Sequence, residues 1–253
     1  MSEDLHRIIS DYFQNASHSP AYHIDVVLLI DATGSMDAII NKAKKAALRI
    51  APMIQERMDK YGKSLETLRI KVISFRDFAF DAEEDAMKES PFFCMPNQKN
   101  ELADWINKIE ARGGGDEPEN SLEAICLAMK SAWNTQSVGK RRHVIILFTD
   151  APPVSLEDDS DPRCCLRKRK DNQYYPKDIP KTLAELEKWW NGEHKRGMPE
   201  QRTKRMILFA PDEYTWQKIA DTFDFVWYIP SRNNNGCNEF DIDDACDVIA
   251  SCC

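Results

Sequence analysis

Residues 25–36 read Asp25-Val26-Val27-Leu28-Leu29-Ile30-Asp31-Ala32-Thr33-Gly34-Ser35-Met36, and this stretch decides the fold. Its apolar residues 26–30 do not alternate with polar ones, which is typical of a strand buried on both faces of a parallel sheet. Residues 37–61 follow with apolar side chains at helical spacing and without glycine, so a helix is expected there. Pro52 predicts a kink or a break within that helix.

The loop between this strand and this helix carries three oxygen-bearing side chains. Asp31, Thr33 and Ser35 stand at alternate positions, at the edge where open parallel sheets bind ligands. Carboxylate and hydroxyl oxygens suit hard cations such as Mg2+ or Mn2+ rather than zinc. Taken alone, the same three residues are equally typical of a helix cap, because their oxygens accept hydrogen bonds from free backbone N–H groups.

These residues resemble the von Willebrand factor A domain family, whose metal-ion-dependent adhesion site begins with Asp-x-Ser-x-Ser, often with Thr in the middle. The resemblance implies that Asp31, Thr33 and Ser35 bind the metal ion. In that family two later loops complete the site, and both have candidates here. Residues 113–119 read Gly-Gly-Gly-Asp-Glu-Pro-Glu, and residues 149–153 read Thr-Asp-Ala-Pro-Pro after an apolar strand. Asp150 matches the second metal-site aspartate of the family.

The middle loop departs from the common pattern of the family. Many members place a Thr there, whereas this chain has Gly-Gly-Asp-x-Pro-Glu, a variant associated with intracellular and bacterial relatives. Asp116 is the preferred metal-linked residue of this loop, and Glu119 is the less favoured substitute. If Asp31, Asp116 and Asp150 all bound Mg2+ directly, their negative charge would outweigh that of the ion. At least one of them is therefore expected to bind through water.

Strands and helices alternate along the whole chain, which predicts an α/β fold with a doubly wound, mostly parallel central sheet and helices on both faces. Strands are expected at 24–30, 68–75, 92–95, 144–148, 206–209 and 225–228. Further helices are expected at 99–111, 120–133, 179–190, 213–222 and 241–252. Residues 1–21 are predicted to be an amphipathic N-terminal helix and linker, and residues 22–253 a single von Willebrand factor A domain.

The composition is that of a globular protein of 253 residues with a formal net charge of −8 and a pI near 5.3, which argues against general nucleic-acid binding. No apolar stretch approaches a membrane span, and residues 1–15 lack a secretory apolar segment, so a cytoplasmic protein is expected. The eight cysteines then indicate reduced thiols rather than a disulfide framework. Cys94 and Cys126 are predicted to lie in or near the core.

Two function classes compete. In the first, the chain is a non-enzymatic binding module in a larger intracellular assembly, and an Asp or Glu of a protein partner completes the shell of a Mg2+ or Mn2+ ion. In the second, the chain is a Mg2+-dependent phosphohydrolase in which Asp31 attacks phosphate. The second is less favoured, because Thr33 stands where such enzymes usually carry a second Asp. The chain also lacks a Gly-x-x-x-x-Gly-Lys phosphate loop. The sequence leaves the oligomeric state open.

Overall fold

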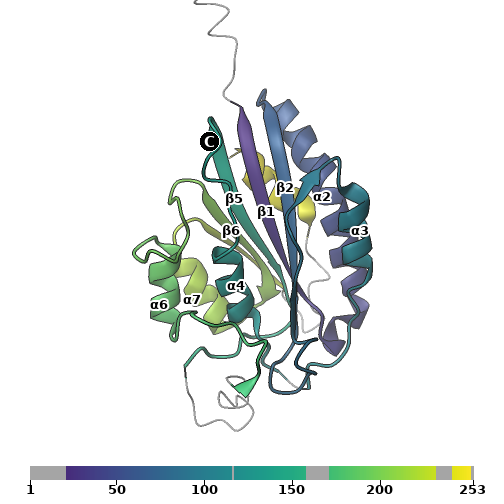
Figure 1. Cartoon of the computed structure of the whole chain (residues 1–253), viewed down its shortest axis with the longest axis vertical. Coiled ribbons are helices and arrows are strands. Elements are labelled where there is room, and N and C mark those ends of the chain that lie inside the picture. Colours follow the sequence, from purple (N-terminus) through teal and green to yellow (C-terminus); the bar gives the residue numbers. More distant parts are fainter. Residues whose placement is uncertain (1–20, 116, 158–170, 232–240, 252–253) are drawn as a thin grey trace, which may run out of the picture.

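The computed structural model describes residues 21–115, 117–157, 171–231 and 241–251. Within them a twisted sheet carries helices on both faces (Figure 1). The predicted fold class, a doubly wound and mostly parallel α/β sheet, is confirmed. The N-terminal helix and linker predicted over residues 1–21 lie, except for Ala21, outside the described residues.

The sheet is parallel except at one edge. Its strands are β1 (Tyr22–Asp31), β2 (Leu65–Phe75), β3 (Met87–Glu89), β4 (Phe93–Met95), β5 (Lys140–Phe148), β6 (Lys204–Pro211) and β7 (Val226–Ser231). The strand order is β3-β2-β1-β5-β6-β7, and β4 also pairs with β2. Both β3 and β4 run antiparallel to β2. The short strand β3 was not predicted, because three residues are too few to show a hydrophobic period.

The helices form two layers. On one face lie α2 (Ile40–Lys60), α3 (Lys99–Asn107) and α8 (Ile242–Ser251), and on the other lie α4 (Ser121–Met129), α6 (Leu183–Trp190) and α7 (Tyr214–Thr222). Figure 1 shows α2 and α3 to the right of the sheet and α4, α6 and α7 to its left. A 3-10 helix, η1 (Gly34–Ala38), precedes α2. Each helical layer covers its own apolar cluster of the core.

The structure narrows the expectation for Pro52 and corrects the one for Cys94. Of the kink or break expected at Pro52, the break is excluded, because α2 continues through this residue and its face at Ala43, Ala47 and Ile50 is fully buried, which offsets the lost hydrogen bond. Cys126 is buried as expected, but Cys94 is exposed. Since successive strand residues point to opposite faces, Cys94 turns outward where its neighbour Phe93 turns into the core.

The central strand β1 determines where the functional loops meet. Every residue of β1 is buried, and the strand pairs in parallel with both β2 and β5. Asp31 at its end is in register with Phe75, and Ile30 is in register with Phe148. The loops that follow β1, β2 and β5 therefore leave the sheet side by side at its carboxyl edge, which lies at the bottom of Figure 1.

The buried side chain of Lys204 links the start of β6 to the end of α6. The side chain of Lys204, the first residue of β6, has no solvent exposure. Its Nζ donates to the carbonyl oxygen of Trp190 at 2.6 Å and also to the side chain of Gln201. Because Trp190 is the last residue of α6, the ammonium group satisfies a carbonyl that the helix end leaves without an intrahelical partner.

This lysine predicts an unusual pH dependence of stability. Burial lowers the pKa of Lys204 to about 8, from its ordinary 10.5. Between these two values the unfolded chain keeps the proton that the folded chain has released, so the free energy of unfolding rises with pH. The rise is at most about 3 kcal/mol, since one pKa unit is worth about 1.4 kcal/mol. Urea unfolding at pH 7.5 and pH 10 measures it.

The variant Lys204→Met lacks this titrating group and serves as the control. The native protein should gain stability relative to the variant between pH 7.5 and pH 10, although other groups titrate in both proteins over the same range. A difference between the two proteins that stays constant with pH would contradict a depressed pKa for Lys204.

Candidate functional site

Four of the predicted metal-site residues lie in one row of closely spaced side-chain oxygens. The hydroxyl of Thr33 donates to Asp31 Oδ1 at 2.7 Å and lies 3.1 Å from Ser35 Oγ. The hydroxyl of Ser35 donates to Asp150 Oδ1 at 3.0 Å. Asp31, Thr33 and Ser35 come from the loop after β1, and Asp150 comes from the loop after β5. The structure therefore brings together oxygens that are more than a hundred residues apart in the sequence.

Asp31 lies at the buried end of this row. Its side chain has no solvent exposure. The backbone N–H of Thr33 also donates to Oδ1, at 2.9 Å, and the hydroxyl of Thr149 donates to Oδ2 at 2.6 Å. Burial, with a smaller contribution from the negative charge of Asp150, raises the pKa of Asp31 to about 6, against the hydrogen bonds from Thr149 and Thr33. The carboxylate is thus held in place at an electrostatic cost.

Asp150 and Ser35 form the open end of the site. Ser35 is exposed and Asp150 is partly buried, whereas Asp31 and Thr33 are buried. Burial raises the pKa of Asp150 despite the hydrogen bond from Ser35. The four side chains therefore lead from the core to the surface, so that a ligand from solvent reaches the oxygens at the end of Ser35 and Asp150.

The middle loop contributes Glu119 to the same neighbourhood. Glu119 is 3% exposed, and its Oε2 has no hydrogen-bond partner among the described residues. Burial, and then the negative charges of Asp31, Asp77, Asp81 and Asp150, raise its pKa to about 10. The other candidate of this loop, Asp116, lies outside the described residues, so its place relative to the site remains a prediction.

The glycine run lets this loop approach the first one closely. A Cβ atom on Gly114 would lie 2.7 Å from Cβ of Thr33 and 2.8 Å from Oε1 of Glu119, and its φ of +92° also favours glycine. The N–H of Gly34 donates to the carbonyl of Gly113 at 3.0 Å. The run is therefore required for the contact between the loops and is more than a flexible turn.

Sequence reasoning missed two further residues of the site. It quoted Thr149 only as part of a motif, although the register of Ile30 with Phe148 places Thr149 beside Asp31 and would have revealed it. Arg76 has no predicted role, yet its buried guanidinium donates to three backbone carbonyls, those of Ala32, Asp85 and Glu110, at 2.7 to 2.9 Å. No sequence period signals such a contact, because the three carbonyls belong to separate loops.

Side chains elsewhere do not offer a comparable site. In the described part of the chain, no group of three or more His, Cys, Asp or Glu side chains is placed to hold a metal ion. Of the four side chains in the row after β1 and β5, only Asp31 and Asp150 are of these types, and Thr33 and Ser35 supply hydroxyls. Among the described residues, no helix is long and apolar enough to cross a membrane.

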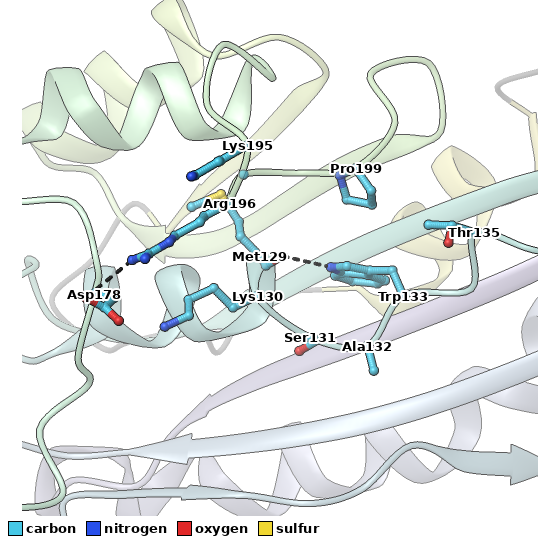
Figure 2. Close-up of a pocket in the computed structure, with 11 residues that line it drawn as sticks. Met129, Lys130, Ser131, Ala132, Trp133, Thr135, Asp178, Lys195, Arg196 and Pro199 are labelled. Carbon is cyan, nitrogen blue, oxygen red and sulfur yellow. Dashed lines mark hydrogen bonds and ion pairs between the residues drawn. The ribbon is translucent and has the colours of Figure 1, made fainter.

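A cavity of about 470 Å³ lies away from these oxygens (Figure 2). Its lining includes Trp133, Lys130 and Arg196. Arg196 forms an ion pair with Asp178 at 3.3 Å, which Figure 2 marks with a dashed line. Since α4 begins beside Glu119 and ends at the cavity, the cavity lies at the opposite end of this helix from the site.

Comparison with known proteins supports the resemblance. The von Willebrand factor A domain family model matches residues 25–161, more than half of the chain. The von Willebrand factor A domain-containing protein 7 of Mus musculus is 34% identical over 135 residues, which cover 53% of this chain and 12% of that protein. The alpha-protein kinase vwkA of Dictyostelium discoideum is 26% identical over 129 residues, which cover 51% of this chain and 18% of the kinase. The matched region thus spans less than a fifth of these relatives.

A solved structure extends the likeness beyond the matched residues. The pilus adhesin SpaC from Lactobacillus rhamnosus GG superimposes on 91% of this chain and 31% of its own, with a TM-score of 0.54 and 12% sequence identity. At this identity the likeness shows the fold alone. Because it covers 91% of the chain, it includes residues after 161 as well as those of the family match.

Proposed function

Because this chain belongs to the von Willebrand factor A domain family, we propose that it is a protein-binding module that docks an acidic residue of a partner onto a bound Mg2+ or Mn2+ ion. The observation that carries this proposal is the row of closely spaced oxygens from Asp31 through Thr33 and Ser35 to Asp150, each 2.7 to 3.1 Å from the next. It joins two loops at the carboxyl edge of the sheet, where ligands of such folds bind.

The donor set fits a hard divalent cation. Asp31 and Asp150 supply carboxylate oxygens, and Thr33 and Ser35 supply hydroxyl oxygens, which are the ligand types that Mg2+ and Mn2+ prefer. When bound, the ion supplies a positive charge with a position open to an outside carboxylate. Because the hydroxyls are neutral, two carboxylates only balance the charge of the ion, and a partner's Asp or Glu remains attracted to it.

Glu119 supports the presence of a cation by a separate argument. A buried carboxylate oxygen without a hydrogen-bond partner is costly, and four other carboxylates surround this one. A divalent ion at Asp31 and Asp150 offsets that repulsion. We therefore propose Glu119 as a carboxylate that supports the ion from the middle loop, directly or through a water, with Asp116 as the alternative in the same loop.

The phosphohydrolase alternative has less support from the geometry. Both oxygens of the Asp31 carboxylate accept hydrogen bonds from protein groups, and the side chain has no solvent exposure. A nucleophile needs an oxygen that reaches the substrate, whereas a group that orients a metal site is commonly held by such hydrogen bonds. These contacts favour a binding role for Asp31.

Metal-dependent capture tests the proposed function. The protein is immobilised and exposed to candidate partners in Mg2+ and in EDTA, while isothermal titration calorimetry measures Mg2+ binding to the protein alone. We expect Mg2+ to bind, and partners to be retained in Mg2+ and released by EDTA. Capture that is insensitive both to EDTA and to the substitution Asp31→Ala would contradict the proposal.

The substitution Glu119→Gln tests the role of the middle loop. Glutamine keeps the shape of the side chain but cannot carry the negative charge that faces the ion, so Mg2+ affinity should fall by about 10- to 100-fold, the usual cost of a supporting ligand. Calorimetric titration with Mg2+ measures the change. Glu117→Gln is the matched control, because Glu117 is exposed two residues away and its loss should leave the affinity unchanged. An unchanged affinity in Glu119→Gln would assign the role to Asp116.

A further inference from the structure

An apolar groove of about 370 Å³ lies between α2, α3 and the edge of the sheet formed by β2 and β4. The buried side chains of Leu68 and Leu102 contribute to it. Leu48, Leu65 and Met95 also line it, and all three are only partly buried while they pack against the core. The groove therefore exposes side chains that belong to the hydrophobic cluster of this face, and an apolar occupant would complete their burial.

The groove is distant from the proposed metal site. Leu65 is the first residue of β2, whereas the metal-site loops follow the last residues of the parallel strands. The groove thus lies towards the opposite edge of the sheet, and its occupancy is independent of the proposed function.

The chain enters the sheet beside this groove. Tyr22, the first residue of β1, is in register with Leu65 in the wall of the groove. The N–H of Tyr22 donates to the carbonyl of Ser64 at 2.8 Å. Neighbouring strands lie about 4.8 Å apart, so residues 1–20, which lie outside the described residues, join the fold next to the groove.

The sequence of residues 1–20 has the pattern of an amphipathic helix that could fill the groove. Its large apolar residues are Leu5, Ile8, Ile9, Tyr12 and Phe13. This spacing of three and four places them on one stripe of a helix, with the charged residues mostly on other faces. Residues 14–21 contain no large apolar side chain and can span up to about 26 Å when extended. The linker of residues 14–21 is therefore long enough for the apolar stripe of residues 5–13 to reach the groove.

We propose that residues 1–13 form an amphipathic helix that docks its apolar stripe into the groove of the same chain. A short helix is marginal in water unless an apolar face packs against a partner, and the groove supplies that partner. The linker holds the segment at a millimolar effective concentration near its own groove, which favours this arrangement over docking to a second copy.

Methyl-resolved NMR of the full chain tests this docking. We expect nuclear Overhauser contacts from the methyl groups of Ile8 and Ile9 to those of Leu68 and Leu102. The double variant Ile8→Ser/Ile9→Ser should shift the methyl signals of both leucines while the rest of the spectrum stays dispersed. The matched control Arg7→Gln, which lies opposite the stripe on the helix, should leave these signals in place.

Two results would overturn the proposal. The first is the absence of any contact from Ile8 or Ile9 to the groove in the native protein, with no change at Leu68 and Leu102 in the double variant. The second is contacts that arise only between differently labelled copies in a mixed sample, which would assign the groove to a second copy. Because the substitutions lie before β1, they leave the core intact, and a loss of folding does not obscure the result.

Discussion

Replacing Asp31 with asparagine is expected to abolish Mg2+ binding at micromolar to millimolar concentrations and, with it, metal-dependent partner capture. Asparagine keeps the size of the side chain and an oxygen that accepts from Thr33, but removes the charge that faces the ion. Partners outside the metal shell are worth about 10- to 100-fold in affinity, so the loss of a direct carboxylate ligand should cost at least about a hundredfold. Calorimetric titration and Mg2+-dependent thermal shifts measure it.

The same substitution should leave the metal-free protein at least as stable as the native one. The Asp31 carboxylate is fully buried beside Asp150, so a neutral side chain relieves an electrostatic cost when no cation is present. Adding Mg2+ should therefore raise the melting temperature of the native protein and not that of the variant. Asp37→Asn is the matched control, since Asp37 is exposed in η1. Equal Mg2+ responses in the native protein and Asp31→Asn would contradict the assignment.

The parts of the site that could be predicted are those that follow directly from β1. The apolar run of this strand predicts a buried parallel strand, and its end places Asp31, Thr33 and Ser35 on a loop at the ligand-binding edge. The sheet order then brings Asp150 to the same edge, because β5 pairs with β1. The local pattern thus predicts the loop with Asp31, Thr33 and Ser35, whereas Asp150 was predicted from the family resemblance, and the pairing of β5 with β1 explains why it lies beside them.

The remaining contacts depend on packing between loops, which has no period in the sequence. The burial of Glu119 accompanies the close approach of Gly114 to Thr33. The types of these residues do not predict that the two loops meet. The break considered at Pro52 does not occur for a related reason, since the burial of the apolar face of α2 outweighs the local effect of this proline. At both positions tertiary contacts determine the structure, because the local sequence pattern is weak at Glu119 and opposes the helix at Pro52.

Arg76 illustrates how such contacts hold the site together. Its Nε donates to the carbonyl of Ala32, which lies between Asp31 and Thr33 in the first loop of the proposed metal site. Its two other nitrogens donate to the carbonyls of Asp85 and Glu110, in the loops before β3 and after α3. The planar guanidinium is suited to three acceptors at once, so Arg76 is a positioning residue for the first loop.

Replacing Arg76 with methionine is therefore expected to lower the free energy of unfolding by roughly 2 to 3 kcal/mol, about 1 kcal/mol for the hydrogen bond to each carbonyl, of which that of Ala32 also accepts from the backbone N–H of Arg112 at 3.0 Å. Because the carbonyl of Ala32 is one of them, Mg2+ affinity should also fall, by about tenfold, as for other outer contacts of metal sites. Arg76→Lys should recover part of the stability, since an ammonium group reaches one of the three acceptors. Urea unfolding and Mg2+ titration of both variants measure the two effects.

Arg112→Met is the matched control for the three hydrogen bonds of Arg76. Arg112 lies in a neighbouring loop and forms an ion pair with Asp85 at 2.7 Å, but its side chain is 57% exposed. Exposed ion pairs contribute about 1 kcal/mol or less, so its loss should change neither stability nor Mg2+ affinity appreciably. Equal effects of Arg112→Met and Arg76→Met would mean that the loss of one positive charge explains both. The three buried hydrogen bonds of Arg76 would then have no special role in positioning the loop after β1.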